Sequence, residues 1–432
     1  MMKIVKADGI AERRQLAAMR ARAAEVGEEI AQSAAAIMED VRLRGMEAVR
    51  EYSLKFDKNE PRELAKEELK AAAGRVPPEL LAALERSAAH IRAYQGRLRD
   101  EIAFGEASWE SPMGGKVGRI VRPLDRVGVY VPGGRAAYPS SVLMNVLPAK
   151  VAGVGEVVMV TPPTGYLNDA VLAAAWVAGV DRCLAVGGVH AVAALTYGVG
   201  FIPRVDKLVG PGNAYVAAAK RLAYGKLDID MVAGPSEVLV IADGGADPKY
   251  VAADLLSQAE HDPLASAVLL TTSEELAEAV DREMIRQTDH LSRRDIIEAS
   301  LRDFGCAVVC GSLSECAALA NKIAPEHLEI VTADPRALLP EIKNAGAVFL
   351  GAYTPEPLGD YMAGPDHVLP TSGTARFFSP LSVDAFIKKT SVLEFDRESL
   401  AKVKGEIVTL ARAEELTAHA NSIQVRFEEE QP

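Results

Sequence analysis

The sequence predicts an α/β fold built on two doubly wound, parallel sheets that face one another. Short apolar runs alternate with helical segments through most of the chain beyond residue 117, and this alternation is typical of parallel strands. The runs carry no regular polar residues, as expected of strands that helices cover on both faces. They form two blocks, and a chain of 432 residues is long for a single hydrophobic core.

The part of the chain before these blocks favours helices. Residues 10–104 are rich in Ala, Glu and Arg and place apolar side chains at three- and four-residue spacing. Pro77-Pro78 marks the start of one of these helices, because proline suits a first helical turn. The segments 118–124 and 126–133 that follow are strand-like, and the second ends in a glycine-bearing turn.

The first block predicts helices and strands in alternation, up to a helix that starts at Asn213. Its expected segments are helix 140–153, strand 156–163, helix 167–179, strand 182–188, helix 190–198 and strand 206–212. The second block has the same pattern without any residue-level repeat of the first. Its expected segments are strand 237–243, helix 249–261 and strands 266–272, 306–311, 327–332 and 347–351. Beyond Pro380 we expect a small terminal unit with one long helix over 397–422.

Composition and charge argue against several classes of protein. The formal net charge of −12 disfavours nucleic-acid binding, because phosphate contacts need clustered Lys and Arg. The chain has no apolar run of about 18 residues that could span a membrane, and its N-terminus lacks the apolar core of a secretory signal. The four cysteines suit reduced thiols, with Cys306 and Cys310 in an expected buried strand. We therefore expect a cytoplasmic enzyme or binding protein.

Polar side chains stand where apolar runs meet turns in the later part of the chain, which is where α/β proteins gather reactive groups. Gln258 and His261 lie three residues apart on a predicted helix and share one of its faces. Zinc binds His, Asp, Glu and Cys, so the residues by themselves favour Glu260 over Gln258 as an oxygen ligand. The alternative is a capped helix end whose histidine is satisfied by a local hydrogen bond.

Five further residues are candidates for catalysis or metal binding. Glu326 and His327 lie at a predicted helix-to-strand junction, where a carboxylate and an imidazole in one pocket supply two proton-transfer groups. Asp360 is expected in a loop held by its prolines and glycines, seven residues before His367. His419 is on the terminal helix and joins the others if the fold brings that helix back. For each, the alternative is a solvated or structural side chain.

Three turns at the ends of predicted strands could receive a cofactor. They are Pro132-Gly133-Gly134, Gly187-Gly188 and Gly210-Pro211-Gly212, and each leads towards a helix. This places them at the ligand-binding edge of a doubly wound sheet, with helix N-termini available for phosphate. The chain has no G-x-G-x-x-G after a strand, so the alternative of tight turns without a ligand stays open.

Seven segments occur along the chain in this order: DRVGVYVPGG, VDKLVGPGNAYV, AGPSEVLVIAD, DLLSQAEHDP, APEHLE, GDYMAGPDHVLPTSGTARF and ELTAHANS. Together they closely resemble the histidinol dehydrogenase family, and the match runs nearly from end to end. Seven segments in order are far more specific than any one of them. The resemblance implies two incomplete Rossmann-like domains facing each other, a helical N-terminal region and a small C-terminal helical dimerisation unit.

The resemblance also implies how the chain is divided into domains. Residues 1–26 would be an N-terminal segment, and 27–129 with 237–379 would form a first α/β domain that carries the metal and catalytic residues. Residues 130–236 would form a second α/β domain on the NAD side. Residues 380–432 would be a C-terminal unit that crosses to the partner subunit of a homodimer.

Individual roles follow from the same resemblance. Zinc, one ion per subunit, would be held by Gln258, His261, Asp360 and His419, which replaces the preference for Glu260. Glu326 and His327 would be the catalytic acid–base pair. The substrate L-histidinol would contact Ser236, Gln258, His261, His327, Asp360, His367, Glu414 and His419, and NAD would contact Tyr130, His190 and Asn213. In the homodimer, Glu414 and His419 would serve the partner's active site.

Two positions depart from the family pattern. The family usually has Gln in a Gly-Gly-Ala-Gln stretch, where this chain has His190 after Gly187-Gly188-Val189. Histidine can still donate a hydrogen bond, but we expect cofactor affinity or its pH dependence to differ. The usual Asn before the His of HVLPT is Asp366 here, which adds a negative charge near the site.

The implied activity is a zinc-dependent, four-electron oxidation of L-histidinol through L-histidinal to L-histidine, the last step of histidine biosynthesis, with NAD as hydride acceptor. One alternative is a related NAD-dependent dehydrogenase of another polar alcohol, such as a sulfonated diol, although Glu414 would repel a sulfonate. A zinc hydrolase would also suit His and Asp ligands with a Glu base, but it leaves the first α/β block without a purpose. A non-catalytic binding protein is disfavoured because every expected catalytic residue is present.

Overall fold

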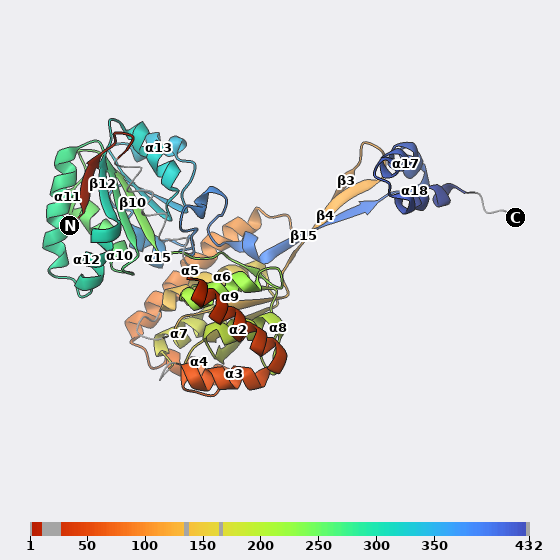
Figure 1. Ribbon diagram of the computed structural model, residues 1–432, viewed down its shortest axis with the longest axis horizontal. Coiled ribbons are helices and arrows are strands. Elements are labelled where there is room, and N and C mark those ends of the chain that lie inside the picture. The colour runs from red at the N-terminus through yellow and green to blue at the C-terminus, as the bar shows by residue number, and fades with distance from the viewer. Residues whose placement is uncertain (1, 11–26, 134–137, 164–166, 429–432) are drawn as a thin grey trace. The chain divides into compact units, whose positions relative to one another are not determined.

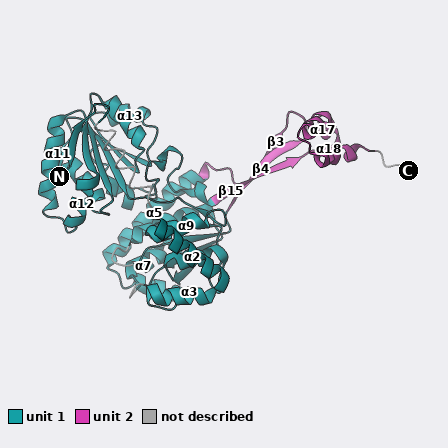
Figure 2. Ribbon diagram, viewed as in Figure 1, with its two compact units in different colours: residues 1–99, 124–386 teal, residues 100–123, 387–432 magenta. Residues whose placement is uncertain are grey.

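The computed structural model describes residues 2–10, 27–133, 138–163 and 167–428, so the start of the predicted N-terminal helical region lies outside the described residues. Contacts divide the chain into two compact units, Met1–Arg99 with Leu124–Phe386 and Asp100–Pro123 with Ile387–Pro432 (Figure 2). In the described ranges, the first unit contains two six-stranded sheets and the second unit contains a three-stranded sheet. No helix in these ranges is long and apolar enough to cross a membrane.

The first sheet is entirely parallel, and its strand order is that of a doubly wound fold (Figure 1). The order is β1 (Lys3–Lys6), β12 (Gly305–Val309), β11 (Ser266–Thr271), β10 (Glu237–Ala242), β13 (His327–Val331) and β14 (Ala347–Leu350). The chain winds outward from β10 to β12 and then returns to the other side of β10 with β13 and β14. The five strands predicted in the second block are therefore confirmed.

Helices cover both faces of this first sheet. Val238 and Val240 pack against α10 (Pro248–Ala259), α11 (Glu274–Thr288) and α12 (Arg294–Phe304) on one face. Leu239 and Ile241 of the same strand pack against α13 (Leu313–Ile323) and α14 (Pro335–Leu338) on the other. Because both faces are buried, the strands need no polar alternation, which is why they are continuous apolar runs in the sequence.

The second sheet has the same winding, with one antiparallel edge strand. Its order is β2 (Arg62–Leu64), β7 (Arg182–Ala185), β6 (Glu156–Thr161), β5 (Arg126–Tyr130), β8 (Lys207–Val209) and β9 (Asp228–Ile229). Strand β2 runs antiparallel to β7, and the other pairs are parallel. The strand order reverses between β5 and β8, and such a switch point is the usual ligand-binding position in open α/β sheets. The helices of this part are α2 (Glu28–Arg44), α3 (Met46–Tyr52), α4 (Lys66–Ala73), α5 (Pro78–Asp100), α6 (Pro139–Ala152), α7 (Asp169–Ala178), α8 (Gly188–Tyr197) and α9 (Ala214–Ala223).

The N-terminal helices pack on this second sheet, which differs from the grouping of 27–129 with 237–379 expected from the sequence. Helix α2 contacts α8 and α9, and its Met38 side chain shares a core cluster with Leu195 of α8. Strand β2 extends the same sheet through β7, and β5 lies at its centre. Strand β1, within the expected N-terminal segment, pairs with β12 of the first sheet. The N-terminal helices join the second sheet because the apolar face of α2 is buried by α8 and α9. This is a long-range contact that no local pattern in the sequence encodes.

Over residues 100–123 and 387–428, the second unit combines three antiparallel strands with three helices. The strands are ordered β15 (Ile387–Glu394), β4 (Lys116–Pro123) and β3 (Gly105–Glu110), so residues 100–123 join the C-terminal segment. The single helix predicted over 397–422 is wrong: the segment forms α16 (Arg397–Ala401), α17 (Lys404–Ala413) and α18 (Thr417–Gln424). Between α17 and α18, Glu415 has a φ of 60°, a left-handed conformation that ends a right-handed helix.

A buried ion pair holds the turn that follows β8. The Nζ atom of Lys220, on α9, donates a hydrogen bond of 2.8 Å to the Gly210 carbonyl and also pairs with Asp230. Asp230 accepts a hydrogen bond of 2.8 Å from the Gly210 amide. The two charged side chains are 4% and 2% exposed, so neither charge is solvated and each depends on the other.

We expect Lys220→Met to destabilise the fold by about 3–5 kcal/mol, because it leaves the Asp230 carboxylate buried without its cation. The free energy of unfolding measured in urea tests this expectation. Arg302→Met is the matched control, since Arg302 pairs with Asp303 on the surface, where ion pairs add little. Equal urea midpoints for the two variants would contradict the structural role of the buried pair.

Candidate active site

The candidate site lies at the amino ends of strands in the first sheet. Strands β10, β13 and β14 begin in register there, with His327 beside Val238 and Ala347. A cavity of about 420 Å³ opens at this edge, and its lining includes His327, Asp360 and His367. Helix α10 brings its last turn to the same edge, because it runs antiparallel to the strand before it. The residues therefore gather at a sheet edge as expected, although the carboxyl ends are the more usual choice.

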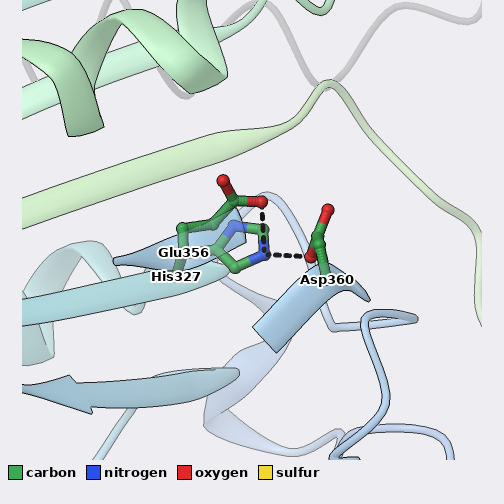
Figure 3. Close-up of side chains that lie close together, drawn as sticks. All are labelled: His327, Glu356 and Asp360. Atoms are coloured by element: carbon green, nitrogen blue, oxygen red, sulfur yellow. Dashed lines mark ion pairs between the residues drawn. The ribbon is translucent and has the colours of Figure 1, made fainter. Parts of the chain in front are cut away.

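His327, the first residue of β13, is held in one tautomer. Its Nδ1 atom donates a hydrogen bond of 2.9 Å to the backbone carbonyl of Glu237, so the lone pair is on Nε2. The Nε2 atom is buried, has no hydrogen-bond partner among the described residues, and lies 4.0 Å from Glu356 and 3.9 Å from Asp360 (Figure 3). Burial lowers the pKa of His327 to about 4, which keeps the ring neutral at physiological pH. A neutral imidazole of this kind can accept a proton or bind a metal.

Glu326, immediately before β13, is buried on the other side of the same ring. Its Oε2 atom accepts a hydrogen bond of 2.9 Å from the Glu237 amide and lies 3.7 Å from Nδ1 of His327. Burial raises the pKa of Glu326 well above its ordinary value, which makes its carboxylate a stronger base. The junction between α13 and β13 therefore brings this carboxylate and this imidazole together.

Asp360 and Glu356 lie four residues apart on one helical turn, α15 (Glu356–Tyr361). The expectation that Asp360 stands in a loop is therefore wrong: Pro355 and Pro357 begin a short helix, where proline fits the first turn. Ser257 donates a hydrogen bond of 3.3 Å to Glu356. Burial raises the pKa of Glu356 to about 8, with a further contribution from the charge of Asp360, and burial raises the pKa of Asp360 to about 6.

The other predicted residues of this region lie around these carboxylates. Gln258, on the last turn of α10, is buried, and its Oε1 atom has no hydrogen-bond partner in the described part of the chain. His261 follows the helix, one residue beyond its C-cap Glu260. His367 places Nδ1 3.9 Å from Asp360 and Nε2 3.5 Å from the Ser141 hydroxyl, and burial lowers its pKa to about 4.

This donor set fits a divalent cation such as zinc. Nitrogen and oxygen ligands are those that zinc accepts, and a cation would offset the repulsion between the buried carboxylates. Single atoms of His327, Glu356 and Asp360 lie within 4.8 Å of one another, which is one possible ligand group. The group that the sequence resemblance implies shares Asp360 and adds Gln258 and His261.

Several residues at the site were not predicted from the sequence. One of them is Glu356. Its four-residue spacing from Asp360 is the sequence pattern that could have identified it. Glu329, on β13, accepts a hydrogen bond of 2.8 Å from the Glu356 amide and shares a hydrogen bond with Asp254 of α10. No sequence pattern singles out Glu329, because it lies inside an apolar strand.

The remaining residues singled out in the sequence lie at the same edge or in the second unit. Ser236 precedes β10 at the same amino edge, where its carbonyl accepts a hydrogen bond from Ser266. Glu414, at the end of α17, and His419, on α18, are exposed residues of the second unit. Asp366 is buried close to the site, and burial raises its pKa well above its ordinary value. That burial disfavours the charged form, which opposes the negative charge expected from the replacement of Asn.

The three residues predicted to contact a cofactor lie at the carboxyl edge of the second sheet. Tyr130 ends β5, where its hydroxyl accepts a hydrogen bond of 3.0 Å from the Gly188 amide and burial raises its pKa to about 12. Asn213 caps α9, accepting hydrogen bonds of 3.1 Å from two backbone amides. His190, on α8, is completely buried, and its Nε2 atom lies 3.3 Å from Asp57.

A family model described as histidinol dehydrogenase matches residues 20–427. The chain belongs to this family. It is 49% identical to the histidinol dehydrogenase of Clostridium acetobutylicum over 99% of each chain. It is also 50% identical to that of Geobacter sulfurreducens over 96% of this chain and 97% of that one. The crystal structure of histidinol dehydrogenase from Elizabethkingia anophelis superposes with a TM-score of 0.90 at 35% identity, covering 98% of both chains.

Membership of the histidinol dehydrogenase family confirms the resemblance found in the sequence. It makes the chain an oxidoreductase, links it to histidine biosynthesis, and implies a nucleotide cofactor. The α/β class with parallel sheets also agrees with the family's structure.

The carboxylates behind the site should make the metal-free protein less stable as pH rises. Burial, together with the charge of Asp254, raises the pKa of Glu329 to about 9 from an ordinary 4.5. Its contribution to stability is therefore fully present below about pH 4.5 and is lost as pH rises through about 9. We expect Glu329→Gln, which keeps an oxygen for the Glu356 amide, to weaken this decline by roughly 1 kcal/mol per pH unit.

Urea unfolding with a chelator at several pH values from 5 to 9 measures the effect. Glu341→Gln, at an exposed glutamate, is the control and should follow the unaltered protein. A pH dependence that is identical in Glu329→Gln and the unaltered protein would exclude Glu329 as its cause.

Proposed function

We propose that the chain oxidises L-histidinol to L-histidine through L-histidinal, in two hydride transfers to NAD, with one zinc ion per subunit. The observation that supports this proposal is the buried pair formed by Glu326 and His327, in which a carboxylate of raised pKa lies 3.7 Å from a neutral ring that lines the cavity. Two proton-transfer groups suit a reaction that removes two hydrides and adds water between them. Membership of the histidinol dehydrogenase family supports the choice of substrate.

We propose that zinc is held by Gln258, His261 and Asp360, with His419 supplied by the partner subunit of a homodimer. The unpartnered Oε1 atom of Gln258 and the raised pKa of Asp360 support this set. A bound cation would coordinate the Gln258 oxygen and would stabilise the charged form of Asp360. Bound zinc would supply a positive charge that orients the imidazole and amino nitrogens of the substrate. His327 then remains free to act as a base.

The proton transfers follow from the positions of the two side chains. In the first oxidation, Nε2 of His327 accepts the hydroxyl proton while hydride leaves the alcohol carbon for NAD, and the product is the aldehyde. Glu326 next accepts a proton from water as the water oxygen bonds to the aldehyde carbon, and protonated His327 returns its proton to the aldehyde oxygen, giving the hydrate and a neutral His327. In the second oxidation, His327 accepts a hydrate proton while hydride leaves the same carbon, and the product is the carboxylic acid.

Substrate and cofactor contacts complete the proposal. We propose that Ser236, His367 and Glu414 contact the substrate, with Glu414 facing its amino group, and that Tyr130 and Asn213 line the NAD site. The position of Tyr130 and Asn213 at the switch point of the second sheet supports their role. We also propose that the protein acts in the cytoplasm, where reduced thiols would match its four buried cysteines.

The test of this function is the yield of NADH from limiting L-histidinol with NAD in excess. The proposal expects two NADH per histidinol, a loss of activity with a chelator, and recovery with zinc. No NADH from histidinol, combined with NADH from another polar alcohol such as a sulfonated diol, would move the substrate assignment to that alcohol.

We expect His327→Asn and Glu326→Gln each to lower turnover by about 10²–10⁴-fold, the usual contribution of a positioned acid or base. Zinc content, measured by atomic absorption, should not change, because neither residue is a proposed ligand. His290→Asn, at an exposed histidine, controls for the loss of an imidazole elsewhere. Loss of zinc from His327→Asn would instead favour the ligand group of His327, Glu356 and Asp360.

We expect His419→Asn to weaken zinc binding and to abolish activity, because His419 is proposed to complete the partner's site. The variant Glu326→Gln should have very low activity for a different reason, because it lacks the proposed base but retains His419. Mixing the two inactive variants under conditions that exchange subunits should restore activity, because one hybrid site then has both groups intact. Mixtures without activity would contradict a site shared between subunits.

A further inference from the structure

The glycine turn after β7 has both of its backbone amides already bonded to protein groups. The Gly187 amide donates a hydrogen bond of 3.1 Å to Asp57, and the Gly188 amide donates one of 3.0 Å to the Tyr130 hydroxyl. In ordinary dinucleotide-binding turns, such amides face the cofactor's phosphates. Here Asp57 occupies the position of an anion beneath the turn.

Asp57 reaches the turn from a distant part of the chain. It ends the π-helical segment Ser53–Asp57 that continues α3, and it is 4% exposed. Single π-helical turns are rare and often mark functional positions, because they re-aim one side chain. The segment thereby directs a carboxylate at a turn 130 residues away in sequence.

His190 is the side chain that pairs with this carboxylate. Its Nε2 atom lies 3.3 Å from the same oxygen of Asp57 that accepts the Gly187 hydrogen bond. The ring packs directly beneath Gly188, where a Cβ atom would stand 3.3 Å from Cε1 and Nδ1 of the imidazole. The rings of Tyr52 and Phe56 flank it, with centroids 6.1 and 6.3 Å away. Because His190 is completely buried, it contacts the inner side of the turn.

The turn after β8 is built in the same way. The Gly210 amide donates to Asp230, which pairs with Lys220 from the helix that follows. In both turns, a glycine amide is bonded to a buried carboxylate, and a basic side chain of the next helix pairs with that carboxylate. Tyr130 lies between them: its hydroxyl bonds to Gly188, and its backbone oxygen lies 2.2 Å from where a Cβ on Gly210 would be.

We propose that Asp57 and His190 form a positioning pair that holds the Gly187-Gly188 turn in the shape that receives the nicotinamide cofactor. The proposal rests on the proposed use of NAD at this edge. It replaces direct contact between His190 and the cofactor, because the imidazole faces Asp57 and the inside of the turn. It also means that the cofactor's phosphates are not held by the amides of Gly187, Gly188 and Gly210, which are taken by Asp57, Tyr130 and Asp230.

The experiment measures NAD binding by isothermal titration calorimetry on the zinc-loaded protein without histidinol. We expect His190→Leu and Asp57→Ala each to raise the dissociation constant for NAD by about tenfold, a loss typical of one well-placed polar contact. His190→Gln should raise it less than His190→Leu, because its amide can still donate to Asp57. In steady state, the KM for NAD should rise while the KM for histidinol stays the same.

Thr196→Val provides the matched control on the same helix. Thr196 is buried near the other end of α8 and donates one hydrogen bond of 2.7 Å to the Val192 carbonyl. The variant therefore removes a comparable bond without touching the turn, and its affinity for NAD should equal that of the unaltered protein. An equal loss of NAD affinity in Thr196→Val and His190→Leu would assign the effect to the stability of α8 and overturn the proposal.

The outcomes separate this proposal from the proposed function. If His190→Leu fails to fold, the comparison of His190→Gln and Asp57→Asn with the unaltered protein carries the test. If the unaltered protein produces NADH from histidinol but all folded variants bind NAD equally well, the positioning pair is overturned and the function stands. If the unaltered protein binds NAD without oxidising histidinol and the variants bind it less tightly, the pair stands and the function is overturned.

Discussion

The hydrogen bond from Nδ1 of His327 to the Glu237 carbonyl is the interaction on which the site depends. It is made between the first residues of two neighbouring strands, so the register of the sheet fixes the orientation of the ring. Because one nitrogen is occupied by the backbone, the other must carry the lone pair. Burial then keeps the ring uncharged, and the carboxylates of Glu356 and Asp360 are arranged around that lone pair.

The two α/β sheets use opposite edges for their proposed tasks. The candidate catalytic residues gather at the amino ends of β10 and β13, whereas the cofactor turns follow the carboxyl ends of β5, β7 and β8. Helices that cross between parallel strands run antiparallel to them, so polar residues at a helix C-terminus reach the amino edge. Gln258 and His261 are placed in this way. One strand order, repeated in both sheets, therefore supports two different kinds of site.

The sequence predicted the strands well, because they depend on local patterns, and the same patterns singled out Glu326 and His327, which lie side by side in the structure. Strands such as Glu237–Ala242 are continuous apolar runs, and the Glu326-His327 junction lies at a boundary between such a run and a helix. It did not predict that α2 packs against α8, since that choice depends on the shape of distant surfaces. It also missed Glu329, a charged residue in an apolar strand whose role comes from Asp254 and Glu356 across the fold.

The row of buried carboxylates behind the site would couple proton release to the binding of the proposed cation. Asp254, Glu329, Glu356 and Asp360 have pKa values of about 6, 9, 8 and 6, so several of them hold protons near neutral pH. A cation that enters among them must displace those protons, because both compete for the same oxygen lone pairs. The apparent affinity of the proposed metal site would therefore increase with pH.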